Sequence, residues 1–342
     1  MSQSTAPSLS ERELEDEAKN FYMSVLIFID QSEGHIKKNS FEAASYGAKV
    51  AELLGTSAEG IVFGKVNDDL AAMGAYGLKK IHTISGEAVN ELDSQVFANV
   101  LAQAVEIIAA KVVVFANNLD GKSIAPRLSA KLKAGLVSGA VALPDISNGF
   151  VVKKNVFSGK AFANVSINTD IKIISLNPNS YKIITTEGTA EVAELNIQMP
   201  GAKVKVTAVN KVSGEIPLAE AELVISGGRG LKGADNWHLI TDLAKLLGAA
   251  TACSRAVADA GWRPHHEHVG QTGLAIAPNL YFAVGMSGAI QHLAGVNRSK
   301  VIVVVNKDPE APFFKAADYG IIGDAFEVMP KIIEAVKKLK GV

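Results

Sequence analysis

Short apolar runs rich in branched residues alternate with helix-length segments along most of this chain. Residues 23–30 ("MSVLIFID") and 111–118 ("KVVVFANN") are bounded by polar turns, as buried parallel strands are. Residues 40–55 and 94–110 between them have the apolar spacing of amphipathic helices. Strands that alternate with helices form βαβ units, in which helices cover both faces of a parallel sheet. The sequence therefore predicts an α/β fold.

The alternation occurs twice, which predicts two domains. Residues 1–20 are a polar extension, 21–217 form an N-terminal α/β domain with a linker, and 218–342 form a second, Rossmann-like α/β domain. Each domain is expected to contain a mostly parallel sheet flanked by helices. Residues 150–178 alternate more strongly and carry turn residues, so we expect antiparallel strands appended to the first sheet.

The composition excludes several classes of function. The net charge is −1, so no basic field indicates nucleic-acid binding. Cys253 is the only cysteine, which excludes an internal disulfide framework and any multi-thiolate metal site, and favours a reducing, cytoplasmic setting. No apolar run approaches the ~20 residues of a membrane-spanning helix, so membrane insertion is not expected.

The second domain opens with a glycine motif. In "GGRGLKG", Gly228, Gly230 and Gly233 match G-x-G-x-x-G between a strand and a helix, where glycines let backbone N–H groups approach phosphate. A tight turn explains the match equally well. The next strand ends in Ser254 and Arg255, where an NAD-binding unit places a carboxylate, so the 2′-phosphate of NADP or another anion fits better. Because a charge at the end of a buried strand needs an anionic partner, Arg255 should meet either a ligand or an acidic side chain, and we favour the ligand.

Three further strand ends have similar features. "VGQTG" offers the side chains of Gln271 and Thr272, "GMSGAIQHLAG" offers Ser287 as a helix N-cap, and "VIVVVNKDPEAP" ends its strand at Asn306. Residues 269–295 contain five glycines, which we expect to let the backbone approach something flat and anionic. Since ligands of open α/β sheets bind at the carboxyl ends of strands, these motifs predict one extended nucleotide site.

Together, "GGRGL", "SRAVADAGW", "VGQTG", "SGAIQHLAG" and "NKDPEAPFFKAADYGIIGD" resemble the alpha subunit of electron transfer flavoprotein, most strongly over residues 222–340. The resemblance implies a heterodimer with a beta subunit and FAD held mainly by the C-terminal domain. It also implies an electron carrier and not a catalyst. Electrons would come from flavin dehydrogenases, such as the acyl-CoA dehydrogenases of fatty acid β-oxidation, and would pass to a quinone oxidoreductase.

The resemblance also implies a set of FAD contacts. They are Arg229, Ser254, Arg255, Val269, Gly270, Gln271, Thr272, Ser287, Gly288, Ala289, Ile290, Gln291, His292, Asn306, Asp324 and Ala325. Many relatives have lysine where Leu274 follows "VGQTG" here. Since reduction adds negative charge to a flavin, Arg255, with His292 as hydrogen-bond donor or cation, is expected to favour reduction.

Two other functions use the same residues. An NADP-dependent oxidoreductase would use "GRGLKG" and Arg255 but needs a catalytic acid or base, and none is evident. A nucleotide-sensing α/β protein needs no redox chemistry. The run "HHEH" (265–268) lacks the spacing of a zinc-binding H-E-x-x-H helix, so we interpret it as a solvated loop and expect no metal site.

Overall fold

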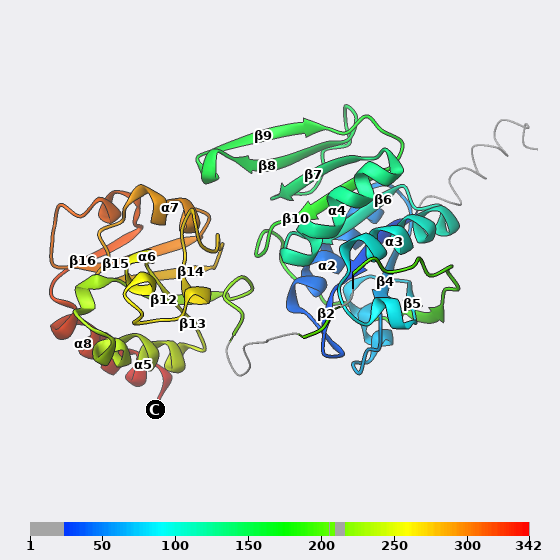
Figure 1. Cartoon of the computed structure of the whole chain (residues 1–342). Coiled ribbons are helices and arrows are strands. Elements are labelled where there is room, and N and C mark those ends of the chain that lie inside the picture. Colours follow the sequence, from blue (N-terminus) through cyan, green and yellow to red (C-terminus); the bar gives the residue numbers. More distant parts are fainter. Residues whose placement is uncertain (1–23, 205, 209–215, 342) are drawn as a thin grey trace, which may run out of the picture. The chain divides into compact units, whose positions relative to one another are not determined.

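The computed structural model describes residues 24–204, 206–208 and 216–341, so the predicted extension (1–20) and part of the linker lie outside the described residues. The chain divides into two compact units (Figure 1). The first is Met1–Lys154 with Asn164–Thr207, and the second is Asn155–Ala163 with Ala208–Val342. We keep residue 218 as the proposed start of the second domain because Leu218 is buried in the core of that unit.

A nine-stranded sheet organises the first unit, in the order β11-β5-β4-β1-β6-β10-β7-β8-β9. Its strands are β1 (Val25–Ile29), β4 (Ala58–Phe63), β5 (Lys80–Ile84), β6 (Val112–Ala116), β7 (Gly135–Ala140), β8 (Val151–Val156), β9 (Ala161–Ser166), β10 (Lys172–Leu176) and β11 (Glu191–Glu194). A separate antiparallel pair joins β2 (Gln31–Ser32) and β3 (His35–Ile36). The helices are α2 (Lys38–Leu53), α3 (Ser94–Ile108) and α4 (Leu119–Leu132), with 3₁₀ turns at η1 (Leu70–Tyr76) and η2 (Glu87–Val89). The turn η3 (Phe157–Gly159), between β8 and β9, belongs to the second unit.

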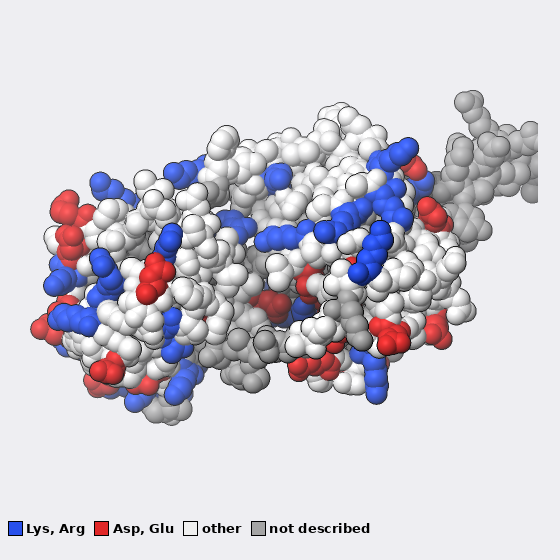
Figure 2. Space-filling model, in the orientation of Figure 1, with Lys and Arg blue, Asp and Glu red and all other residues white. Residues whose placement is uncertain are grey.

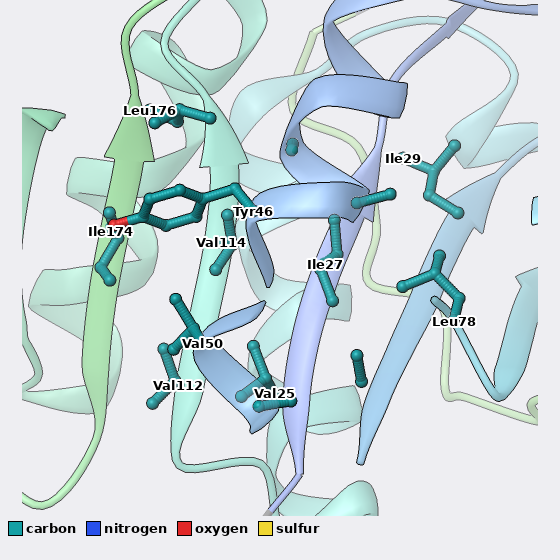
Figure 3. Packing of buried hydrophobic residues seen from close by; sticks show 14 of the residues in the cluster. Val25, Ile27, Ile29, Tyr46, Val50, Leu78, Val112, Val114, Ile174 and Leu176 are labelled. Carbon is teal, nitrogen blue, oxygen red and sulfur yellow. The ribbon is translucent and has the colours of Figure 1, made fainter. Parts of the chain in front are cut away.

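Two hydrophobic clusters lie on the two faces of this sheet. On one face, α2 packs Tyr46 and Val50 against residues of β1, β6 and β10, and the Tyr46 ring reaches toward Ile174 (Figure 3). On the other face, α3 and α4 pack against Leu26, Val113 and their neighbours. The strands β1 and β6 are apolar at every position because both of their faces are buried.

The strands predicted within residues 150–178 divide into two kinds. The pairing of β8 with β7 is antiparallel, as expected for the appended strands. The last of the predicted strands, β10, instead lies in the middle of the sheet and pairs in parallel with both β6 and β7. The antiparallel prediction is therefore wrong for β10, because alternation along a strand does not specify its partner.

A five-stranded, fully parallel sheet organises the second unit, in the order β13-β12-β14-β15-β16. Its strands are β12 (Leu223–Gly227), β13 (Ala250–Cys253), β14 (Leu280–Val284), β15 (Val301–Asn306) and β16 (Tyr319–Ile322). The helices are α5 (His238–Leu247), α6 (Arg255–Asp259), α7 (Ile290–Val296) and α8 (Ala325–Lys340), with 3₁₀ turns at η4 (Arg229–Leu231), η5 (Ala234–Trp237), η6 (His265–Glu267) and η7 (Pro312–Ala316). The predicted α/β class with two mostly parallel sheets is confirmed.

The second sheet has a topological switch point. From β12 the chain first adds β13 on one side, and it then crosses to add β14 on the other side. The loops that leave β12 and β14 therefore diverge to opposite faces, which opens a crevice at the carboxyl ends of these two strands. No helix in the described part of the chain is long and apolar enough to cross a membrane.

Candidate functional site

A cavity of about 570 Å³ lies at this switch point in the second unit. The segments that follow β12, β13, β14 and β15 form its walls, together with residues 268–272 from the connection to β14. Its volume is within the range of ~300–1,000 Å³ that is usual for small-molecule sites. The cavity therefore lies where ligands of parallel α/β sheets bind.

All but three of the sixteen residues expected to bind the cofactor line this cavity. Those that do are Arg229, Ser254, Arg255, Val269, Gly270, Gln271, Thr272, Ser287, Gly288, Ala289, Gln291, His292 and Asn306. Ile290 is 74% exposed at the start of α7, and Ala325, the first residue of α8, is buried in the core. Asp324 caps α8 through a hydrogen bond from the Phe326 amide (3.0 Å). These three lie outside the cavity lining.

Five lining residues were not predicted as contacts and do not belong to the glycine fingerprint. They are Ala256, His268, Gly285, Met286 and Asp308. Each is within two residues of a predicted contact, so proximity to a strand end was the available signal. Motif matching missed them because it selects only the positions that define the motif.

The glycines of the loop after β12 leave room for the backbone of the loop after β14, which packs against them. A Cβ atom on Gly230 would lie 2.7 Å from the Gly285 Cα atom, and one on Gly228 would lie 2.4 Å from the Gly285 carbonyl oxygen. The Gly230 amide also donates a hydrogen bond to this oxygen (3.0 Å). The loops after β12 and β14 thus pack backbone against backbone at the mouth of the crevice.

The glycines of residues 269–295 follow the same pattern. A Cβ atom on Gly295 would lie 2.5 Å from the Gly270 amide nitrogen, and one on Gly288, at φ +80°, would lie 2.5 Å from the Phe313 Cβ atom. Close contacts between loops of the protein therefore account for these two glycines. The expectation that such glycines exist to admit something flat and anionic is corrected accordingly: they shape the cavity by letting its walls approach each other.

The glycine motif is also not a conventional dinucleotide turn. After β12 the chain forms η4 and then η5 before α5 begins at His238, so no helix follows the motif directly. Lys232 between the two turns has a left-handed backbone, with φ 63°. The prediction of a strand–glycine–helix unit is wrong in this respect, because η4 lies within the motif and η5 separates the motif from the helix.

The surroundings of Arg255 differ from the predicted ones. The strand ends at Cys253, and Arg255 is the first residue of α6, with Ser254 as its N-cap. The Arg255 side chain is 66% exposed, and its Nε atom lies 3.3 Å from the Asp259 carboxylate, one helical turn away. The premise of a buried charge that needs a ligand is therefore wrong, since water and Asp259 already solvate it. The residue still lines the cavity.

Ser287 and Asn306 hold the loop after β14 in place. Helix α7 begins at Ile290 with Ala289 as its N-cap, so Ser287 is not the predicted cap. The Ser287 carbonyl accepts a hydrogen bond from the Phe313 amide (3.1 Å). The Asn306 Nδ2 atom donates to the Met286 carbonyl (2.6 Å). Both residues shape the cavity through contacts within the protein.

His292 is buried on the cavity wall and forms a hydrogen bond with the Tyr281 hydroxyl (2.8 Å). Its ring and the Tyr281 ring pack beside Phe313. Burial lowers the pKa of His292 to about 4, so the imidazole is neutral at neutral pH. Of the two expected roles, the cation is therefore wrong, and that of a neutral hydrogen-bonding group is compatible with the structure.

The histidine-rich loop is more ordered than predicted. Glu267 is buried and receives hydrogen bonds from the Arg263 Nε atom at 2.9 and 3.0 Å, so the interpretation as a solvated loop is wrong for this residue. No metal-binding group of histidine, cysteine and carboxylate side chains occurs among the described residues. Cys253 is buried, and burial raises the pKa of its thiol to about 12.

The cavity matches an anionic ligand with a long polar part. Two arginines, Arg229 and Arg255, supply positive charge, while Gln271, Thr272 and backbone amides supply hydrogen-bond donors. On the face of the second unit that Figure 2 shows, Lys and Arg are interspersed with Asp and Glu.

Comparison with known proteins identifies what this arrangement resembles. Residues 217–297 match the electron transfer flavoprotein FAD-binding domain, and residues 25–199 match the electron transfer flavoprotein domain. The chain is 36% identical to electron transfer flavoprotein subunit alpha of Syntrophomonas wolfei over 91% of this chain and 98% of the relative. It is 33% identical to the subunit of the same name from Bacillus subtilis, over 92% and 98%, and 29% identical to protein FixB of Clostridium saccharobutylicum, over 93% and 97%.

Proposed function

The chain belongs to the family of electron transfer flavoprotein alpha subunits, and from this premise we propose that it is the FAD-carrying subunit of a two-subunit electron carrier. The observation that carries the proposal is the cavity at the switch point of the second sheet. Most of its lining residues lie within the 217–297 segment that matches the FAD-binding domain.

The residues of the cavity suit FAD by their chemistry. We propose that Arg229, with backbone amides of the glycine loops, binds the pyrophosphate, because arginine and backbone N–H groups are the usual partners of phosphate oxygens. Gln271, Thr272 and His292 offer neutral polar groups suited to the uncharged parts of the cofactor. The proposed contacts at Ile290, Asp324 and Ala325 are supported by resemblance alone.

The redox chemistry comes from FAD, which can accept and release electrons singly or in pairs when bound. The protein's part is to hold the cofactor and to control access to it. We propose that electrons enter from flavin dehydrogenases, such as acyl-CoA dehydrogenases, and leave to a quinone oxidoreductase. His292 and Asp324, the acid–base groups among our predicted contacts, are hydrogen-bonded to the Tyr281 hydroxyl and the Phe326 amide, which supports a carrier more than an NADP-dependent oxidoreductase.

A beta subunit is the expected partner, because the relatives are named as alpha subunits. We propose that this second subunit covers part of the cofactor, since one open-sheet domain leaves one side of a dinucleotide exposed. A reducing cytoplasmic setting is supported by the single, buried cysteine.

Absorption spectroscopy tests the proposal. We expect the chain, co-expressed with its beta subunit, to purify as a yellow heterodimer whose flavin band is bleached by an acyl-CoA dehydrogenase with its substrate. Arg229→Ala should weaken FAD retention, whereas Lys245→Ala, an exposed cation on α5 outside this cavity, should not. A colourless heterodimer that takes up no added FAD would refute the proposal.

A further inference from the structure

His268 is a buried imidazole on the cavity wall that has no hydrogen-bond partner. The residue is 8% exposed and lines the cavity. Throughout the described part of the chain, no donor or acceptor is paired with either nitrogen of its ring. Neither ring nitrogen is among the fully enclosed unpartnered atoms of the described residues, so both are accessible from the cavity and can meet a group that binds there.

The backbone around His268 is fixed on both sides. Its carbonyl accepts a hydrogen bond from the Leu274 amide (2.9 Å), and the next residue, Val269, donates to the Cys253 carbonyl (3.1 Å). The residue is therefore held between the end of β13 and the following loop, and its position does not depend on a ligand.

Two glycines of that loop make room for the imidazole ring. A Cβ atom on Gly273 would lie 2.8 Å from the His268 Nδ1 atom, and one on Gly270 would lie 3.4 Å from its Nε2 atom. Any larger residue at Gly273 would displace the ring. The loop and the histidine thus form one packed unit beside the cofactor site.

Burial and the charges around His268 disfavour its protonation while the cavity contains no anion. Its pKa is lowered from its ordinary value by burial and then by the positive charge of Arg255 on α6. Asp259 on α6 acts in the opposite direction, and His265 on η6 lowers the pKa further. His292 on α7 also faces it, but that ring is neutral because it is buried. An anion in the cavity would reverse the balance.

We propose that His268 is a further cofactor-binding residue, outside the "VGQT" motif, that binds the anionic cofactor as an imidazolium. The inference rests on the proposed function, because it places FAD in this cavity. When FAD binds, one proton moves from bulk water to the free ring nitrogen, and the resulting N–H donates to an anionic oxygen of the cofactor. No electron transfer and no other reactant are involved.

The sign of the pH dependence follows from this uptake. Binding raises the pKa of His268, so FAD binds most tightly below the pKa of the free protein. That extra affinity is lost as pH rises through the higher pKa of the complex. Each unit of difference between the two pKa values corresponds to a tenfold change in the dissociation constant, or about 1.36 kcal/mol. We expect about a tenfold weakening between about pH 5 and about pH 8.

The test is flavin fluorescence titration of the full heterodimer with FAD across this pH range, for wild type, His268→Gln and His268→Ala. His238→Gln is the matched control, because His238 is an exposed histidine of the same unit whose ring lies near the Asp235 carbonyl. We expect both His268 variants to lose the pH dependence and His238→Gln to keep it. Calorimetry of wild type and His268→Gln in two buffers of different ionisation enthalpy should show that proton uptake disappears in the variant.

The outcomes separate the inference from the proposed function. A His268→Gln protein with unchanged pH dependence and unchanged proton uptake would overturn the inference while leaving FAD binding intact. If both variants fail to fold, NMR titration of wild type decides, since a His268 pKa that does not rise on FAD addition equally overturns it. Wild type that binds no FAD at any pH would overturn the proposed function as well.

Discussion

Replacing Gly230 with alanine tests whether the glycine motif serves the protein's own packing. A Cβ atom there would meet the Gly285 Cα atom at 2.7 Å and its carbonyl oxygen at 2.8 Å. Both atoms belong to backbone, so no side chain can rotate away to relieve the contact. The φ angle of Gly230 is not in the left-handed region, so the whole cost of the substitution is this collision.

Its magnitude follows from the cost of overpacking. Extra atoms forced into a packed region cost about 1–3 kcal/mol when the surroundings must shift. Here the neighbour is Gly285, which has a φ of +63° and itself lies 2.9 Å, N to O, from the Val305 carbonyl. Because that loop is already constrained, we expect Gly230→Ala to lower the free energy of unfolding of the second unit by about 1–3 kcal/mol.

Tryptophan fluorescence can follow this unit selectively. The chain has two tryptophans, Trp237 and Trp262, and both belong to the second unit. Urea unfolding of the full chain without added FAD, monitored through them, gives the change in stability. Gly233→Ala is the matched control from the same motif: its φ is 171°, an extended value, and an added Cβ has no atom within 4 Å. We expect the control to remain within about 0.5 kcal/mol of wild type.

The result distinguishes two explanations of the motif. If Gly230 exists only to let phosphate approach, Gly230→Ala should unfold like wild type in the absence of FAD and lose only cofactor affinity. If the loops pack on each other as the structure shows, stability falls without FAD, and affinity falls with it. Equal unfolding midpoints for Gly230→Ala and Gly233→Ala without FAD would refute the packing argument.

Three other predictions concern charges and domain boundaries. Arg255→Ala should lower the one-electron potential of bound FAD by at most roughly 40 mV, because an exposed charge at ~4 Å is worth ~1 kcal/mol in water and Asp259 already offsets it. Arg255→Lys should give an intermediate potential, and spectroelectrochemical titration measures all three proteins. Burial raises the pKa of Asp30 to about 6 from 3.8, so its ionised form destabilises the fold as pH rises through that window. Because Lys37 (3.0 Å) and Asn118 (2.6 Å) donate hydrogen bonds to this carboxylate, Asp30→Asn also removes an ion pair; the expected result is loss of the fall in unfolding temperature between about pH 4 and about pH 6, and a variant that keeps the wild-type fall would contradict this. A fragment starting near residue 218 should fold and bind FAD. A circular-dichroism melt of the fragment without a cooperative transition would contradict this.

The fold was predictable because its strongest signals are local. Buried parallel strands such as β1 and β15 are apolar at nearly every position, and the intervening helices repeat with another period. Strand order is a different matter. β10 enters between β6 and β7, and its partners are more than 30 residues away in the sequence, so neither its alternation nor its turn residues could assign it.

The sequence predicted the position of the site better than it predicted the roles of the residues in it. Motifs at the ends of four strands had to converge, because all the strands of the sheet are parallel. The roles depended on features with no local signal. Whether Arg255 ended a strand or began a helix was settled by where β13 stops, and this reversed its burial. The reason for Gly230 lay in another loop, 55 residues further along the chain.

The two histidines of the cavity wall show why partners decide function more than residue type does. His292 belongs to a recognisable motif, yet Tyr281 already binds its ring and burial keeps it neutral. His268 belongs to no motif, yet its ring is buried without a partner and lies close to the positive charge of Arg255. The Nδ1 atom of His292 is enclosed and also lacks a partner, so the two rings differ in access: we expect an anion that enters the cavity to change the protonation of His268 more readily, because burial disfavours the charged form of His292 more strongly. Sequence comparison selects His292, whereas the accessible, unpartnered ring nitrogens on the cavity wall beside Arg255 lead us to propose His268 as the residue through which cofactor binding senses pH.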